Sequence, residues 1–258
     1  INEIIDISTV IARVLKSGVV GSNKGIGLDR VIIMPSFSKK DKQIIKIANR
    51  LSLKTIFLSF CSNGADVKKL RSMFNYNVEI ISKIESRSAI LHLTEICHES
   101  DAILIDRGDL SRDVQLEKIA HIQDYILNLA NDINTPVFVA TNLMESMLYN
   151  SQPTRAEIND IVGALNSGAI GLVLAAETAI GKYPADAVRI LAQIIHENND
   201  YDNDNKTDPE KFFQFTSPLL NAPHGGKLVQ QYHNKEFVDN TYPNLFVDDK
   251  KWNFSRKL

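Results

Sequence analysis

Short apolar segments alternate with longer amphipathic segments through the middle of the chain. Each short segment is nearly continuous in apolar residues, many of them β-branched, which is typical of strands buried on both faces of a sheet. Six such segments occur, at residues 31–34, 55–58, 78–81, 102–105, 136–140 and 170–174. Amphipathic stretches lie between them, so the pattern predicts repeated parallel βα units.

Several of the amphipathic stretches begin with a helix-start signal. The signals are Ser38 or Asp41, Asp66, Asp113, the Thr154–Glu157 capping box and Pro184 in a first turn. An α/β fold with this repeat is either an open doubly wound sheet or a closed (β/α)8 barrel. No Gly-x-Gly-x-x-Gly turn follows the first predicted strand, so a dinucleotide-binding fold has no positive support.

The two ends of the chain differ from this repeat. Residues 1–30 carry alternating apolar positions and then four glycines, as a small β hairpin region does. Residues 199–216 are polar and lack periodicity, which predicts a linker. Residues 217–258 contain the only tryptophan but no clear period, so we expect a short tail or a fragment of another module.

Charge and cysteine usage narrow the class of protein. The 258 residues include 29 Lys+Arg and 31 Asp+Glu, for a net charge of -2, and no apolar run approaches a membrane span. We therefore expect neither nucleic acid nor a membrane as a partner. The two cysteines, Cys61 and Cys97, lie far apart in apolar runs. They predict a reducing compartment, with the cytoplasm as the expected location and an organelle as the alternative.

Charged and hydroxyl residues follow four successive predicted strands. These segments are Ser82–Glu85, Asp106–Asp109, Thr141–Asn142 and Ala175–Thr178. In parallel βα folds, ligands bind at the carboxyl ends of the strands, so the four segments are expected to meet at one edge. Lys83 and Glu85 are two residues apart on extended chain and point to the same side.

Carboxylates and a glycine turn in these segments indicate a particular chemistry. Asp109 is placed to share a hard cation with Glu85, as oxygen ligands of Mg2+ do. Gly108 permits close approach of the backbone, and the helix start after it offers N–H groups to an anion. With Lys83, this set indicates a phosphoryl-transfer or enolate site. The alternative is that the charged residues are solvated loop residues.

Six short motifs in order carry a resemblance to a known family. They are Lys24–Leu28, Ile81–Glu85, Arg107–Leu110, Ala140–Met147, Pro153–Glu157 and Glu177–Pro184. Together, over residues 5–196, they resemble pyruvate kinase. The resemblance implies a TIM-type barrel, dependence on Mg2+ (or Mn2+) and K+, phosphoryl transfer between phosphoenolpyruvate and ADP, and a homo-oligomer.

The resemblance also implies a domain plan. In the family the first barrel strands precede a small lid domain, and nothing in residues 1–30 matches those strands. We therefore expect residues 1–30 to be the end of the β lid domain. Residues 31–198 are then a partial catalytic barrel that lacks its first strands.

Residue roles follow from the resemblance by position. Lys83 resembles the lysine that neutralises the transferring phosphoryl group, and Glu85 and Asp109 resemble the two Mg2+ ligands. The backbone of Gly108 and Asp109 would receive the substrate carboxylate, and Thr141 resembles the threonine near the methylene carbon.

Two further residues of these motifs, and one residue that precedes a motif, complete this set of expectations. Arg107 and Glu177 are expected to have supporting roles. Asp106 stands where the family usually has a small residue, and its charge is expected to repel an anionic substrate.

A second interpretation of the chain is an inactive barrel derived from pyruvate kinase, kept as a scaffold or as a subunit of a larger assembly. Within residues 217–230, the segment Asn221–Val229 resembles the start of ATP sulfurylase. That likeness suggests a fusion with a sulfurylase-like module. An ordinary turn at Pro223–Gly226 accounts for the same residues.

Overall fold

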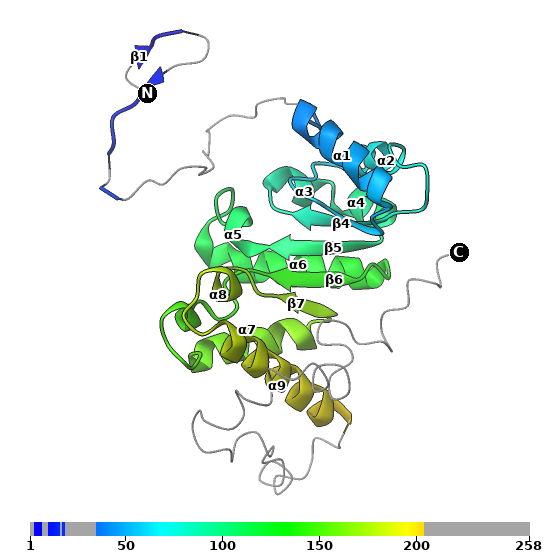
Figure 1. Cartoon of the computed structure of the whole chain (residues 1–258). Coiled ribbons are helices and arrows are strands. Elements are labelled where there is room, and N and C mark those ends of the chain that lie inside the picture. Colours follow the sequence, from blue (N-terminus) through cyan, green and yellow to red (C-terminus); the bar gives the residue numbers. More distant parts are fainter. Residues whose placement is uncertain (1–2, 7–9, 16, 19–34, 204–258) are drawn as a thin grey trace, which may run out of the picture. The chain divides into compact units, whose positions relative to one another are not determined.

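A computed structural model describes residues 3–6, 10–15, 17–18 and 35–203 of the chain (Figure 1). The chain divides into two compact units, Ile1–Met34 and Pro35–Leu258. The predicted strand at 31–34 and the predicted tail at 217–258, including the sulfurylase-like segment, lie outside the described residues.

The described part of the first unit contains a pair of antiparallel strands. Strand β1 (Glu3–Ile4) pairs with β2 (Val10–Ile11), with Glu3 opposite Ile11 and Ile4 opposite Val10. This pairing agrees with the hairpin that the alternating pattern predicted.

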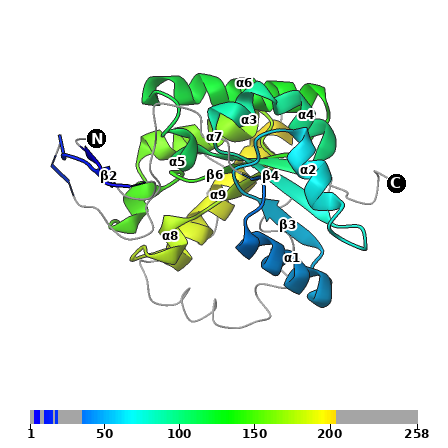
Figure 2. The same ribbon diagram turned by 90° about the horizontal axis from the view of Figure 1, so that it is seen from above.

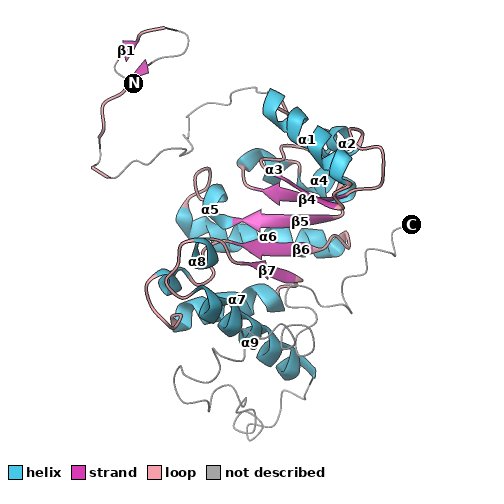
Figure 3. Ribbon diagram, viewed as in Figure 1, coloured by secondary structure: helices cyan, strands magenta, loops and turns pink. Residues whose placement is uncertain are grey.

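The second unit contains a parallel sheet of five strands, with the order β3-β4-β5-β6-β7 among the described residues (Figure 3). The strands are β3 (Thr55–Leu58), β4 (Glu79–Ile84), β5 (Ala102–Asp106), β6 (Val137–Ala140) and β7 (Gly171–Val173). Each of the five lies at a segment where the apolar runs predicted a strand. Sequential neighbours pair throughout, as they do in repeated βα units.

Helices connect the strands. Before β5 these are α1 (Lys39–Leu51), α2 (Gly64–Arg71), α3 (Arg87–Leu91) and α4 (Leu93–Glu99). After β5 come α5 (Arg107–Leu110), the 3-10 turn η1 (Leu116–Lys118), α6 (Ile119–Asp132) and the 3-10 turn η2 (Glu145–Leu148). The last are α7 (Arg155–Asn166), α8 (Ala176–Ala179) and α9 (Pro184–Asn203).

Two of the helix-start predictions are confirmed by full capping boxes. The Ser38 hydroxyl accepts the Asp41 N–H while the Asp41 carboxylate accepts the Ser38 N–H. Thr154 and Glu157 form the same reciprocal pair at α7. Pro184 opens α9, as predicted.

Two other helix starts differ from the prediction. The cap of α2 is Asn63, whose side chain accepts the Asp66 N–H, because Asn is a strong N-cap residue in its own right. Asp113 does not cap a helix. Its carboxylate accepts the Arg87 N–H instead, and α6 begins only after η1.

The buried residues decide between the two candidate folds. One large core joins alternate strand residues, such as Ile80, Ile103 and Val139, to residues of the helices. A smaller cluster on the opposite face, with Ile81 and Leu104 among its members, contains no residue of a described helix. A doubly wound sheet carries helices on both faces, whereas a barrel carries them on its outer face only. The arrangement in Figure 2, with helices around the outside of the strands, is therefore that of a TIM-type α/β barrel segment.

The last helix is longer than the sequence predicted. Helix α9 continues to Asn203, so residues 199–203 are helical although the linker was expected from residue 199. Among the helices that the structure describes, none combines the length and the apolar character needed to cross a membrane.

Candidate active site at the carboxyl ends of the strands

The register of the sheet places Lys83 and Asp106 on the same face. Lys83 pairs with Leu104 in the β4–β5 ladder, and Asp106 pairs with Ala140 in the β5–β6 ladder. Side chains alternate along a strand, so Lys83, Leu104 and Asp106 all project to the face that the helices leave uncovered. The carboxyl ends of β4, β5 and β6 therefore bring their polar residues together, as predicted.

Lys83 lies between two carboxylates. Its Nζ is 2.5 Å from Glu85 Oε1 and 2.9 Å from Asp106 Oδ2. The side chains of Lys83, Glu85 and Asp106 are 20%, 1% and 10% exposed. Two largely buried carboxylates this close to Lys83 stabilise its positively charged form at the carboxyl ends of the strands.

Glu85 is the most deeply buried of the three. Its Oε2 accepts the Phe60 N–H at 2.5 Å. Its Oε1 is in ion-pair distance of Lys83 but is buried without a partner in hydrogen-bond geometry. The Lys83 ammonium is therefore the group that offsets the charge of this buried oxygen.

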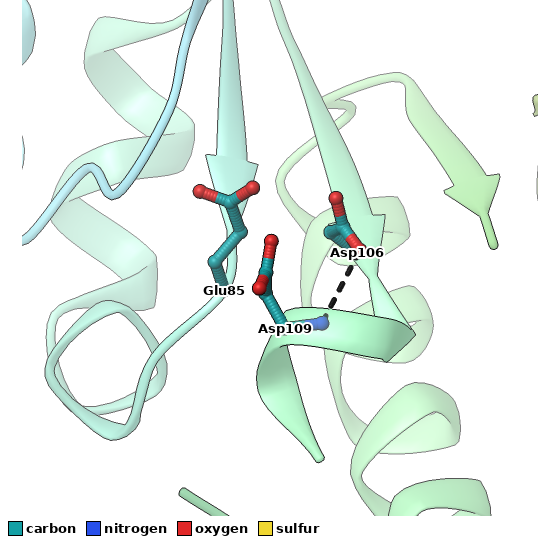
Figure 4. A group of neighbouring side chains, drawn as sticks. All are labelled: Glu85, Asp106 and Asp109. Atoms are coloured by element: carbon teal, nitrogen blue, oxygen red, sulfur yellow. Dashed lines mark hydrogen bonds between the residues drawn. The ribbon is translucent and has the colours of Figure 1, made fainter. Parts of the chain in front are cut away.

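Three carboxylates gather at one point, as Figure 4 shows. One oxygen each of Glu85, Asp106 and Asp109 lies within 4.8 Å of the others, which makes the group able to hold a metal ion. An all-oxygen donor set of this type suits Mg2+ or Mn2+. The predicted pair Glu85 and Asp109 is thus brought together, and Asp106 joins it. Asp109 also forms an ion pair with Arg112 at 3.0 Å.

The charges in this cluster shift one another's protonation. Burial opposes the charged form of Lys83, but its pairs with Glu85 and Asp106 outweigh burial and hold its pKa above the ordinary value. Burial raises the pKa of Glu85 despite its contact with Lys83. Burial also acts on Asp106, but Lys83 outweighs it and holds the Asp106 pKa below the ordinary value. Of these two carboxylates, Asp106 is therefore the one whose surroundings favour the charged form.

Thr141 stands beside Asp106 in an unusual backbone conformation. Its φ is 67°, and Asn142 after it has a φ of 53°, both in the left-handed region that is costly for a β-branched residue such as threonine. The Thr141 hydroxyl accepts the Gly108 N–H at 2.9 Å. It lies 3.2 Å from Asp106 Oδ1 and 2.6 Å from the Ala140 carbonyl, to one of which it donates its single proton.

Gly108 lies close to the side chains of Thr141 and Asp106. A Cβ on Gly108 would lie 3.4 Å from Thr141 Oγ1 and 3.5 Å from Asp106 Oδ1. The next N–H, that of Asp109, is directed at Asp106 Oδ1 at 3.4 Å. The two backbone donors that we predicted to receive an anion are thus at the site, and side chains of the protein accept from them.

Arg107 belongs to the support of the site. Its guanidinium donates to the carbonyls of Thr141, at 2.8 and 3.0 Å, and of Asn142, at 3.0 Å. The same group pairs with Asp160 at 2.6 Å. Arg107 therefore stabilises the left-handed backbone of Thr141 and Asn142 through hydrogen bonds to their carbonyls.

Glu177 also binds backbone rather than the cluster. It is buried, and its carboxylate accepts the N–H of Met144 at 3.1 Å and of Ala175 at 3.0 Å. These bonds tie the chain after β6 to the chain after β7. Among the hydrogen bonds and ion pairs of the described residues, those of Arg107 and Glu177 do not include Lys83. Their supporting roles stay a prediction.

Sequence reasoning undervalued one residue of the site. Asp106 was expected at the shared edge and given no role there except to repel an anion, whereas in the structure it contacts Lys83, Thr141 and the Asp109 N–H. A signal was present, because Asp106 ends the apolar run of β5 two residues after Leu104 and so had to share its face. The identity of its partners depends on the pairing of β4, β5 and β6.

Known proteins with similar sequences extend these observations. The family model of the pyruvate kinase barrel domain matches residues 1–188. A pyruvate kinase from Mycobacterium tuberculosis is 37% identical over 190 residues, which are 72% of this chain and 40% of that protein. One from Clostridium acetobutylicum is 34% identical over 200 residues, which are 76% of this chain and 42% of that protein.

A solved structure agrees with the sequence comparisons. The crystal structure of a pyruvate kinase from Cryptosporidium parvum superimposes with a TM-score of 0.61 at 35% identity, covering 64% of this chain and 36% of that one. The chain spans about two fifths of the length of the curated relatives it matches. On this family match and these identities, the chain belongs to the pyruvate kinase family and carries a segment of its barrel domain.

Proposed function

We propose that the protein catalyses phosphoryl transfer between phosphoenolpyruvate and ADP, giving pyruvate and ATP. The observation that carries the proposal is the meeting of Lys83, Glu85, Asp109 and Thr141 at the carboxyl ends of β4, β5 and β6. In a solvated loop such residues would be exposed and far apart. Here the Lys83 side chain is mostly buried and the Glu85 side chain is fully buried. The family of the chain supports the same activity.

Each of these residues has a place in the proposed reaction. The bond between phosphorus and the enol oxygen breaks, an oxygen of the ADP β-phosphate bonds to phosphorus, and the enolate then takes a proton on its methylene carbon. Lys83 supplies a fixed positive charge to the transferring group, whose charge spreads in the transition state. The N–H groups of Gly108 and Asp109 bind the substrate carboxylate, and Thr141 lies beside the methylene carbon.

The acidic residues of the site fit a divalent cation. Glu85 and Asp109 would hold Mg2+ or Mn2+, because one carboxylate oxygen of each lies within 4.8 Å of the other in an all-oxygen group. Such an ion, when bound, stabilises negative charge on the phosphoryl group and the enolate. Dependence on K+ is part of the same proposal and rests on the family alone.

The test is a turnover assay on the full chain. Pyruvate formation from phosphoenolpyruvate and ADP, with Mg2+ and K+ present, is followed through lactate dehydrogenase. We expect Lys83→Met to lose turnover by at least about a thousandfold, while Lys118→Met, an exposed lysine on η1, keeps it. Chelation of the divalent cation should also abolish turnover. No turnover by the unmodified protein would contradict the proposal.

A scaffold or assembly role is the second candidate. The observation that favours it is that Lys83 is already paired on two sides by Glu85 and Asp106. Size-exclusion chromatography with the turnover assay separates the two functions. Co-purification with a large assembly and no turnover supports the scaffold, whereas an active protein of defined size counts against it.

A further inference from the structure

Asp106 occupies donors that the proposed function assigns to the substrate. Its Oδ2 is 2.9 Å from the Lys83 ammonium, and its Oδ1 lies 3.4 Å from the Asp109 nitrogen and 3.2 Å from the Thr141 hydroxyl. A lysine, a hydroxyl and a backbone N–H around one carboxylate are the groups that bind an anionic ligand. The Asp106 carboxylate thus makes the contacts that a bound anion would make at this site.

The surroundings keep Asp106 charged and in place. Its side chain is 10% exposed, and it lies at the end of β5, a strand with neighbours on both sides. It is also the N-cap of α5, through the bond from the Asp109 N–H. Other charges close by are Glu85, which shares Lys83, and Asp109, which pairs with Arg112. No second lysine or arginine contacts Asp106 among the bonds of the described residues.

We propose that Asp106 sets the anion affinity of the site: it acts as a built-in competitor that holds Lys83, Thr141 and the Asp109 N–H until a substrate anion takes them. The inference rests on the proposed function, since it assigns those donors to the substrate. Asp106 is here a specificity-determining residue, and its carboxylate does no chemistry. An entering phosphate or carboxylate has to displace it from Lys83 and to bind beside its negative charge.

Two variants separate the charge of Asp106 from its capping bond. Asp106→Asn removes the charge but keeps an oxygen that accepts the Asp109 N–H, and asparagine is a good N-cap residue. Asp106→Ala removes both. Asp124→Asn, which neutralises an exposed carboxylate on α6, is the matched control for loss of one charge elsewhere. Circular dichroism confirms that each variant is folded.

The measurement is a titration of the 15N-labelled full chain with inorganic phosphate, without a divalent cation, followed by the amide signals of Gly108 and Asp109. Removing a unit charge next to the anion is expected to tighten phosphate binding by about tenfold in Asp106→Asn. Asp124→Asn should stay within about twofold of the unmodified protein. In the turnover assay, Asp106→Asn should lower KM for phosphoenolpyruvate more than it changes kcat.

Each outcome bears on the inference. Phosphate affinity that is unchanged or weaker in Asp106→Asn, or no phosphate binding by any variant, overturns it. Weaker binding of Mn2+ together with weaker phosphate binding would assign Asp106 to the cation instead, and would also overturn it. Tighter phosphate binding without turnover in any variant supports the inference and counts against the proposed function. Turnover with unchanged phosphate affinity leaves the function standing and removes the role of Asp106.

Discussion

Replacing Arg107 by methionine removes the group that holds the turn at Thr141 and Asn142. The guanidinium makes three hydrogen bonds to the two carbonyls of that turn and an ion pair with Asp160. Its side chain is 8% exposed, whereas that of Asp160 is 40% exposed. The bonds to the turn are thus made in a buried setting, while the partner carboxylate remains in contact with water.

The cost follows from these contacts. Hydrogen bonds to a charged group contribute about 1.5–3 kcal/mol each, although bonds that share one donor group do not add fully. Thr141 in the left-handed region costs about 1–3 kcal/mol and needs its surroundings to hold it, whereas asparagine tolerates that region. We therefore expect Arg107→Met to lower the free energy of unfolding by about 3–5 kcal/mol.

Urea unfolding followed by circular dichroism measures this change. With a slope of about 2–3 kcal/mol/M, the midpoint should fall by more than about 1 M. Asp160→Asn should cost only about 1 kcal/mol, because that carboxylate is partly solvated, with its side chain 40% exposed. The matched control is Arg189→Met on α9, which breaks a pair with Asp186 within one helix and should cost about 1 kcal/mol or less.

A second readout distinguishes support of the turn from general stability. Release of the turn should move Thr141 away from Asp106, so turnover should fall in Arg107→Met under conditions where the protein remains folded. A loss of stability below about 1 kcal/mol, equal to that of the Arg189 control, would refute the reasoning. It would mean that the left-handed turn is stable without the guanidinium.

Two other expectations concern groups outside the site. Burial opposes the charged form of Glu157, but hydrogen bonds from Ser146 and Thr154 outweigh it and hold its pKa below the ordinary value. Its contribution to stability is therefore present above the unfolded pKa of about 4.3 and is lost as the pH falls through the folded pKa. Glu157→Gln should reduce the fall of the urea midpoint that the unmodified protein shows as the pH is lowered, and an unchanged fall would contradict the assignment. Thr154→Ala should lower the free energy of unfolding by about 1 kcal/mol at pH 7. Burial raises the pKa of Cys61 to about 12, so its thiol should react with a disulfide reagent in the native protein at pH 8 at least about a hundredfold more slowly than in urea. Equal rates in the two conditions would show that the thiol is accessible.

Much of the fold follows from local patterns. The apolar run at 102–105 matches β5 closely, because a strand buried on both faces leaves a continuous apolar signature whatever surrounds it. The run at 55–58 matches β3 as well, although Thr55 and Phe57 are exposed there. The capping boxes at Ser38 and Thr154 are local bonds between residues three apart, so residue identity alone predicts them. The predicted meeting of Lys83, Glu85 and Asp109 needed only the rule that parallel strands end at one edge.

The tertiary structure decided what depends on residues far apart in the chain. The βα repeat by itself left a doubly wound sheet and a barrel open, and the resemblance to pyruvate kinase implied the barrel; the placement of the helices on one face agrees with that barrel. The contacts of Asp106 with Lys83 and Thr141 join three strands, and the bonds of Arg107 join α5 to the turn after β6. Such contacts are set by register and by backbone conformation. Periodicity and composition do not encode them, whereas they do encode the elements and the edge where the chemistry lies.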